Sequence, residues 1–125
     1  VIEIPDDSKL QTIDENAFSF SAIKSIRIPS SVTSIGENAF YFCRQIEVIE
    51  IPDDSKLQTI DKNAFYNSSI KSIQIPSSVI SIGEDAFFGC INLCIIEIDN
   101  SEMISLCQTA FTDCQNALLM IPFHS

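Results

Sequence analysis

The stretch IRIPSSVTSIGENAF, residues 26–40, recurs as IQIPSSVISIGEDAF at residues 73–87. The copies lie 47 residues apart, and residues 1–47 align with residues 48–94 without a gap. Of the 47 aligned positions, 13 differ and 34 are identical. A third, more divergent copy begins at Ile95. This periodicity predicts stacked repeating units, because one such unit cannot bury its apolar face alone.

Each 47-residue block contains two shorter units, and each unit carries an Ala-Phe pair. The five Phe residues of these pairs are Phe18, Phe40, Phe65, Phe87 and Phe111. They are separated by 22, 25, 22 and 24 residues, which is the length of one coil in many solenoids. We therefore expect a single domain over residues 1–125 with about five coils, made of the double repeats 1–47 and 48–94 and the partial repeat 95–125.

The apolar residues keep one phase in every unit. In most of the units, β-branched residues alternate with polar ones just before a proline, as in Ile26, Ile28 and Pro29, which predicts a short strand buried on one side. A second apolar set follows each strand and ends in the Ala-Phe pair. The positions expected to be buried are Ile26, Ile28, Val32, Ile35, Ala39 and Phe40 and their equivalents Ile73, Ile75, Val79, Ile82, Ala86 and Phe87. Leu10, Ile13, Ala17 and Phe18 form the matching apolar set of the first unit.

An Asx residue precedes most of the Ala-Phe pairs. These residues are Asn16, Asn38, Asn63 and Asp85. Because Asn and Asp side chains accept hydrogen bonds from exposed N–H groups at the start of a helix, we expect each to cap a short helical turn.

The motif I-x-I-P-S-S-V-x-S-I-G-E-[ND]-A-F, present at Ile26–Phe40 and Ile73–Phe87, resembles the BspA-type leucine-rich repeats of bacterial and protist cell-surface proteins. The resemblance implies an α/β fold: a right-handed leucine-rich-repeat solenoid with a short-stranded parallel β-sheet on the concave face. Short helical or 3-10 turns are expected on the convex side. The resemblance also implies a cell-surface or secreted location. The last unit departs from the pattern, since Cys107 stands where Gly36 and Gly83 stand in the others.

Composition excludes several classes of function. Seven basic and seventeen acidic residues give a net charge of −10, which opposes binding to nucleic acid or to an anionic membrane surface. The apolar runs are only a few residues long, so we expect no membrane insertion in this segment. Because the first residue is Val1 and no signal-peptide pattern follows it, we expect a fragment of a longer protein.

Few residues are suited to catalysis or metal binding. The one histidine is His124, next to the last residue, so we expect no catalytic residues and no enzyme activity. The five cysteines lack the paired C-x2-C spacing of common zinc sites, so we expect neither a metal nor another cofactor. Cys43, Cys90 and Cys114 each follow their Phe by three residues and are expected to point inward as small core side chains. Cys90 and Cys114 lie one coil apart, within reach of a disulfide bond.

One row of side chains is predicted to face away from the strand core. It consists of Glu3, Arg27, Glu50, Gln74 and Glu97, and we call it the strip. A second row runs beside the strip and contains Val1, Ser25, Val48, Ser72, Ile95 and Leu118. The strip is the candidate ligand-binding surface, and its surplus of acid favours a basic partner. The alternative is a solvated sheet surface on which Arg27 bridges Glu3 and Glu50.

Two functions remain open. The first is a non-enzymatic protein-binding or adhesion module that recognises a protein or extracellular-matrix ligand. The second is a structural spacer or self-assembling repeat element without a dedicated ligand site. End-to-end self-association is expected in either case, because uncapped solenoid ends expose apolar surface and open strand edges.

Overall fold

The computed structural model describes residues 4–5, 7–98, 108–114 and 118–120. Short strands and turns alternate along this part of the chain. The elements are β1 (Thr12–Ile13), β2 (Ser25–Arg27), β3 (Ser34–Ile35), β4 (Val48–Glu50), β5 (Thr59–Ile60), β6 (Ser72–Ile75), β7 (Ser81–Ile82), β8 (Ile95–Ile98), the 3-10 helix η1 (Gln108–Phe111) and β9 (Leu118–Met120).

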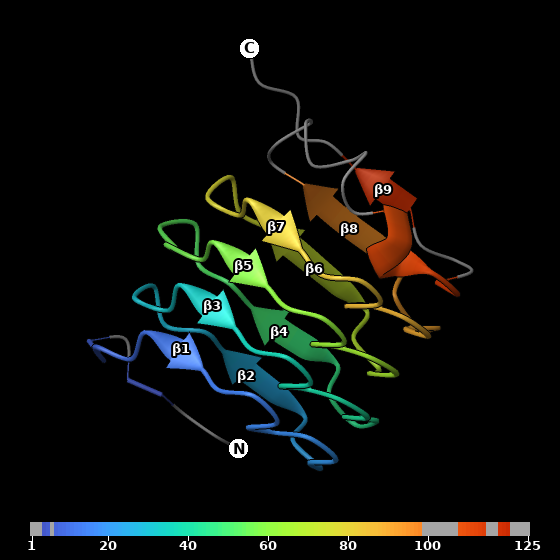
Figure 1. Cartoon of the computed structure of the whole chain (residues 1–125), viewed down its shortest axis with the longest axis horizontal. Coiled ribbons are helices and arrows are strands. Elements are labelled where there is room, and N and C mark those ends of the chain that lie inside the picture. Colours follow the sequence, from blue (N-terminus) through green and yellow to red (C-terminus); the bar gives the residue numbers. More distant parts are fainter. Residues whose placement is uncertain (1–3, 6, 99–107, 115–117, 121–125) are drawn as a thin grey trace.

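The strands form two parallel sheets that run along the stack of coils (Figure 1). One sheet has the order β1-β3-β5-β7 and the other has the order β2-β4-β6-β8-β9. Each coil contributes one strand to each sheet and then passes to the next coil, so the fold is a parallel-stranded β-solenoid, as the repeat predicted. The second short extended segment of each unit therefore pairs with its equivalents and forms a sheet of its own.

Strand register places equivalent side chains above one another. In β6 and β8, Ile73 pairs with Ile96 and Ile75 pairs with Ile98, and all four are buried. The predicted core positions of residues 26–40 and 73–87 are all buried as well. The strand and core assignments made from the apolar pattern are thus confirmed for the inner coils.

The first coil differs from this pattern. Leu10 is 37% exposed, whereas its equivalent Leu57 in the second block is fully buried. Ala17 is exposed and Phe18 is half-buried, although both belong to the apolar set that matches buried residues of the inner coils. The reason is position in the stack, because the described part of the first coil packs against a neighbouring coil on one side only.

The five Phe residues of the Ala-Phe pairs form the predicted ladder. Neighbouring rings in the series Phe18, Phe40, Phe65, Phe87 and Phe111 stack with centroids 5.2, 5.0, 5.1 and 4.8 Å apart. The three central rings are fully buried. Stacked parallel rings at this separation fill the space between coils, so the ladder fixes the rise from one coil to the next.

We use "arc" for the chain between a strand of the four-stranded sheet and the next strand of the five-stranded sheet, namely residues 14–24, 36–47, 61–71 and 83–94. These four arcs consist of hydrogen-bonded turns, and the described residues contain a 3-10 helix only at η1. The predicted helix caps are wrong. Asn16, Asn38 and Asn63 have φ angles of 59–60° and Asp85 has 57°, which is the left-handed region that Asn and Asp tolerate better than most residues.

Two glycines allow adjacent coils to approach closely at the start of an arc. A Cβ atom on Gly83 would lie 2.4 Å from the backbone nitrogen of Lys62, and one on Gly36 would lie 2.8 Å from that of Glu15. The backbone N–H of Gly83 donates to the Ile60 carbonyl oxygen at 2.7 Å. Glycine is required at this position because neighbouring backbone, which cannot rotate away as a side chain can, occupies the place of a Cβ.

Candidate binding surfaces

The strip residues lie on one face of the five-stranded sheet. Arg27 on β2 pairs in register with Glu50 on β4, and Gln74 on β6 pairs with Glu97 on β8. Arg27, Glu50 and Gln74 are exposed, whereas Glu97 is half-buried. Glu3 lies outside the described residues. The sheet therefore brings four of the five strip residues into one row.

The strip carries its own polar contacts. Arg27 and Glu50 form an ion pair between exposed side chains, which is one half of the bridge expected from the sequence. The amide nitrogen of Gln74 donates to Asp53 Oδ1 at 3.4 Å, and this contact ties the strip to the turn after β4. An exposed ion pair of this kind contributes only about 0–1 kcal/mol to stability, so a partner can replace it at small cost.

The second row adds apolar surface to the strip. Val48 is 55% exposed, and Ile95 is also exposed, while Ser25 and Ser72 occupy the equivalent positions on β2 and β6. In β8 the pattern of burial alternates from residue to residue, so Ile95 faces out while Ile96 is buried. Val1 lies outside the described residues. The face thus combines charged, polar and aliphatic side chains, which is a composition suited to contact with a protein.

The cysteine row is structural. The thiols of Cys43, Cys90 and Cys114 donate to the carbonyl oxygens of Phe18, Phe65 and Phe87 at 2.9, 3.1 and 3.0 Å, respectively. Cys43 and Cys90 are buried and Cys114 is half-buried, so the predicted inward orientation is confirmed. Cys43, Cys90, Cys94 and Cys114 are free thiols, and Cys107 lies outside the described residues.

Burial and hydrogen bonding shift the acidity of these thiols. Desolvation raises the pKa of Cys43 to about 11. The hydrogen bond with Cys114, and then burial, raise the pKa of Cys90, and the same hydrogen bond lowers the pKa of Cys114. Cys43 and Cys90 are therefore protonated at neutral pH, where a thiol is a poor nucleophile and a poor metal ligand.

The described residues contain no group of three or more His, Cys, Asp or Glu side chains placed to hold a metal ion. His124 lies outside the described part of the chain. The same described part has no helix with the length and apolar character needed to cross a membrane.

A second aromatic series on the arcs was not anticipated from the sequence. Tyr41, Tyr66 and Phe88 directly follow the buried Phe residues, and their rings stack at 5.0 and 4.8 Å. Phe20 and Phe42 stack at 5.5 Å one position further on, and Phe20 is 72% exposed. The signal was present in the sequence as aromatic residues one and two places after Ala-Phe, but the apolar phase of the core does not include those positions.

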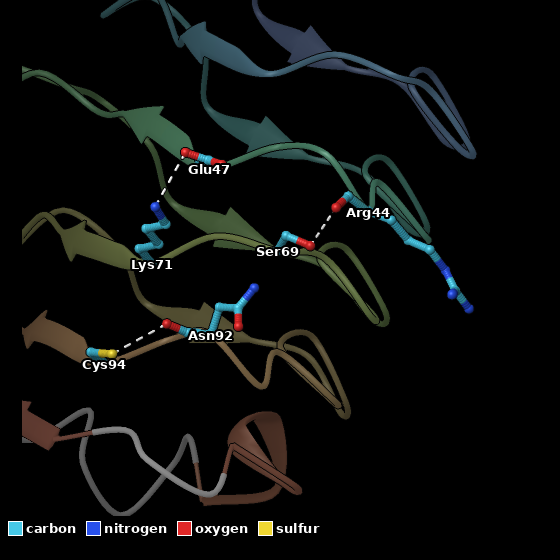
Figure 2. A network of polar contacts seen from close by, with 6 residues as sticks. All are labelled: Arg44, Glu47, Ser69, Lys71, Asn92 and Cys94. Atoms are coloured by element: carbon cyan, nitrogen blue, oxygen red, sulfur yellow. Dashed lines mark hydrogen bonds and ion pairs between the residues drawn. The ribbon is translucent and has the colours of Figure 1, made fainter.

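Polar side chains lie beside these aromatic rings, and we call the surface formed by Arg44, Glu47, Ser69 and Lys71 the polar edge. The guanidinium carbon of Arg44 is 5.1 Å from the centroid of the Phe42 ring, and its carbonyl oxygen accepts a hydrogen bond from the Ser69 hydroxyl. Lys71 Nζ lies 3.3 Å from Glu47 Oε2 on the same edge, as Figure 2 shows. Three recesses of about 420–460 Å³ border Arg44.

Comparison with solved structures identifies several bacterial proteins as similar. A leucine-rich cell-surface protein from Faecalibacterium prausnitzii is 30% identical with a TM-score of 0.64, over 70% of this chain and 23% of that protein. The pneumococcal vaccine antigen PcpA is 31% identical with a TM-score of 0.71, over 74% of this chain and 23% of that one. A leucine-rich-repeat protein from Bacteroides capillosus is 26% identical with a TM-score of 0.67, over 78% and 75% of the two chains.

The first two of these structures are much longer than the present sequence, which spans 23% of each. No protein of curated function matches the chain. The family model of the BspA-type leucine-rich-repeat region matches residues 1–118 with six copies of the repeat. That match covers nearly the whole sequence, so the chain belongs to the BspA-type leucine-rich-repeat family.

Proposed function

We propose that this chain is a non-enzymatic protein-binding module of a cell-surface or secreted leucine-rich-repeat protein, and that it serves in adhesion to a protein or extracellular-matrix ligand. The strip, formed by Glu3, Arg27, Glu50, Gln74 and Glu97, is the proposed contact surface. The observation that carries the proposal is the alternation along the five-stranded sheet, where one set of side chains is buried and the other is held outward in register. Solenoids offer such extended surfaces to partners.

Several features of the chain support this assignment. The family match and the likeness to a protein described as a leucine-rich cell-surface protein support the location. The row of exposed charged and polar side chains on the five-stranded sheet supports a binding role.

The acidic character of the strip defines the proposed partner. Glu50 and Glu97 are two strands apart, which is about 9.6 Å at the spacing of a sheet. This separation is close to the screening length of roughly 8 Å at physiological salt, so the two carboxylates act partly as one field. A basic protein surface would be steered toward them, and its rate of association would fall as salt is added.

Binding to a panel of purified extracellular-matrix proteins, measured at low and at physiological salt, tests the proposal. Glu50→Lys should weaken binding by lowering the association rate, while Arg27→Glu should leave it unchanged or strengthen it. Glu84→Lys makes the same charge change as Glu50→Lys at an exposed arc position and should have little effect. Binding that is independent of salt and insensitive to both strip variants would place the contact elsewhere.

The spacer function has its own support. The 34 identities in 47 aligned positions give successive double repeats nearly the same surface, and Glu3 and Glu50 are among the identical pairs. A chain that stacks into solenoids but binds none of the panel proteins would favour the spacer over the adhesion module.

A further inference from the structure

The outward face of the five-stranded sheet repeats its chemistry every two coils. Val48 on β4 and Ile95 on β8 are exposed aliphatic side chains of the second row, and Ser72 on β6 lies between them in register. Glu50 and Glu97 follow two residues later on the same strands, with a buried residue in between. β4 and β8 therefore each present one aliphatic and one acidic side chain outward, and the strand between them presents neither.

The order of the strands determines the repeat distance of this pattern. β4 and β8 are second neighbours in the sheet, with β6 between them (Figure 1). Neighbouring strands lie about 4.8 Å apart, so the aliphatic pair and the acidic pair each recur after about 9.6 Å along the stack of coils. The chain itself carries this period, because Val48 and Ile95 are 47 residues apart, as are Glu50 and Glu97.

A polypeptide lying along the stack matches both sites when its own side chains recur at this distance. In a polyproline II helix every third residue returns to the same side after about 9.3 Å. In an extended strand every second residue does so after about 6.6 Å. In an α-helix the corresponding distances are about 5.4 Å for one turn and about 10.5 Å for seven residues. Of these regular conformations, polyproline II is the closest match.

The hydroxyl groups of the second row suit the same conformation. A polyproline II helix makes no internal hydrogen bonds, so its carbonyl oxygens need donors from a partner or from water. Ser25 and Ser72 alternate with Val48 and Ile95 along the row. Neither serine hydroxyl is hydrogen-bonded within the described part of the chain, so both can donate to a ligand.

The flank of the second row formed by the strip is acidic. Asp53 adds a carboxylate to Glu50 and Glu97 there, because it accepts a hydrogen bond from Gln74 on the strand between them. Arg27 is the one basic residue of the strip, and it is paired with Glu50. Three carboxylates thus lie beside one guanidinium, so this flank favours cationic side chains.

The opposite flank has a different balance of charge. Lys24, Glu47 and Lys71 directly precede the second-row residues of β2, β4 and β6, and all three are exposed. Lys71 Nζ lies 3.3 Å from Glu47 Oε2. Two lysines and one glutamate disfavour cationic side chains here, so a ligand on the second row is expected to carry its basic residues on the strip side.

We propose that the strip and the second row together bind a polypeptide segment in the polyproline II conformation, which lies along the stack and carries a basic residue at every third position. Its apolar side chains contact Val48 and Ile95, its basic side chains pair with Glu50 and Glu97, and its carbonyl oxygens accept hydrogen bonds from serine hydroxyls such as that of Ser72. The proposal rests on the function proposed for the strip, because it specifies the ligand class of that same surface.

Three labelled twelve-residue peptides of equal charge test the ligand class by fluorescence anisotropy. The central-lysine peptide has ten prolines and two lysines three positions apart, a separation of about 9.3 Å in a polyproline II helix. The end-lysine peptide has the same composition with its lysines nine positions apart, about 28 Å, so they cannot reach Glu50 and Glu97 together. The flexible peptide keeps the central lysines and replaces the prolines by glycine and serine.

The central-lysine peptide should bind about tenfold more tightly than either of the others. Compared with the end-lysine peptide, it gains a second charged hydrogen bond, for which tenfold, about 1.4 kcal/mol, is a modest value. Compared with the flexible peptide, it gains the apolar contacts and a backbone already in the bound conformation. Equal affinity of the two proline peptides would overturn the charge period, and equal affinity of the central-lysine and flexible peptides would overturn the conformation.

Two variants locate the peptide on the sheet. Glu97→Gln should remove the advantage of the central-lysine peptide over the end-lysine peptide, because one carboxylate of the pair is gone. Ile95→Ser should weaken both proline peptides about fivefold and affect the flexible peptide less, because it removes an aliphatic contact. Glu84→Gln and Ile80→Ser make the same changes at exposed residues outside the strip and the second row, and they should alter neither comparison.

The outcomes separate this ligand class from the function proposed for the strip. A central-lysine peptide that keeps its advantage on a folded Glu97→Gln protein would overturn the site, and so would control variants with equally large effects. If no peptide binds but a matrix protein still binds in a manner that depends on Glu50, the ligand class is wrong and the proposed function stands. Loss of peptide binding and of matrix binding together would overturn both.

Discussion

Single buried side chains hold the coils at their spacing, and Phe65 is the central example. It is fully buried and stacks on Phe40 at 5.0 Å and on Phe87 at 5.1 Å. Phe65→Ala should lower the free energy of unfolding by about 3–5 kcal/mol, because it leaves a cavity that rings on both sides cannot collapse to fill. Denaturant unfolding followed by circular dichroism measures the loss.

Ile80→Ala provides the comparison for this loss, because Ile80 is exposed on the same solenoid. Its effect should stay within about 0.5 kcal/mol, as for most surface substitutions. Equal losses of unfolding free energy in Phe65→Ala and Ile80→Ala would contradict a contribution of the Phe ladder to stability.

The buried thiol of Cys43 predicts a dependence of stability on alkaline pH. Its pKa is raised from 9.0 to about 11 in the folded protein, so above pH 9 the unfolded chain releases a proton that the folded chain retains. The free energy of unfolding should therefore fall as pH rises from 9 to about 11. Cys43→Ser should reduce this slope, and serine fits the position because Ser21 and Ser68 occupy it in other coils.

Unfolding measured at intervals between pH 8 and pH 11 in both proteins checks the prediction. Cys94→Ser serves as the control, because it makes the same substitution at an exposed cysteine. A Cys43→Ser protein with the pH dependence of the original chain would show that another group is responsible.

The strands of this protein could be predicted from its sequence, whereas the turns could not. The strands and their buried faces followed from the apolar phase, because packing against equivalent residues leaves one arrangement for each position. The backbone conformation of the arcs could not be predicted in the same way, because an Asn before Ala-Phe is compatible with both a helix cap and a left-handed turn. Asn38 and Asn63 adopt the second, and their N–H groups donate to the carbonyl oxygens of Lys62 and Glu84 in the next coil.

The same limit applies to the binding surfaces. The row containing Arg27, Glu50 and Gln74 was predictable, because strand alternation determines which side chains face outward. The recesses that border Arg44 were not, because they depend on how side chains of neighbouring coils lie against one another, such as Asn67 across Gly89. Such a contact between neighbouring coils has no signature within a single repeat.

The glycine at the start of each longer arc gives a prediction about coil spacing. Gly83→Ala should lower the free energy of unfolding by about 1–3 kcal/mol or more, because the added methyl meets the Lys62 backbone at 2.4 Å. Ser81→Ala, two residues earlier at an exposed strand position, should cost much less. Thermal unfolding of the two variants compares them, and a Gly83→Ala protein as stable as Ser81→Ala would contradict the close approach.

The stack of coils leaves one apolar face open at its first described coil. Leu10 and Ala17 are exposed there and Phe18 is half-buried, although the same side chains are fully buried in the second block. The sequence around them is nearly identical in the two blocks, so what covers them in the interior is a neighbouring coil. A face with this composition is complementary to another coil of the same kind.

The polypeptide of residues 1–125 should therefore self-associate as its concentration rises, through this open face. Leu10→Lys should reduce association, because it places a charge on the apolar surface that a second molecule would cover. Ile80→Lys makes the same change in net charge at an exposed site away from that face and should leave association unchanged. Sedimentation velocity over a range of concentrations measures all three proteins. A strictly monomeric original chain, or equal effects of the two lysines, would show that the open coil face does not drive assembly.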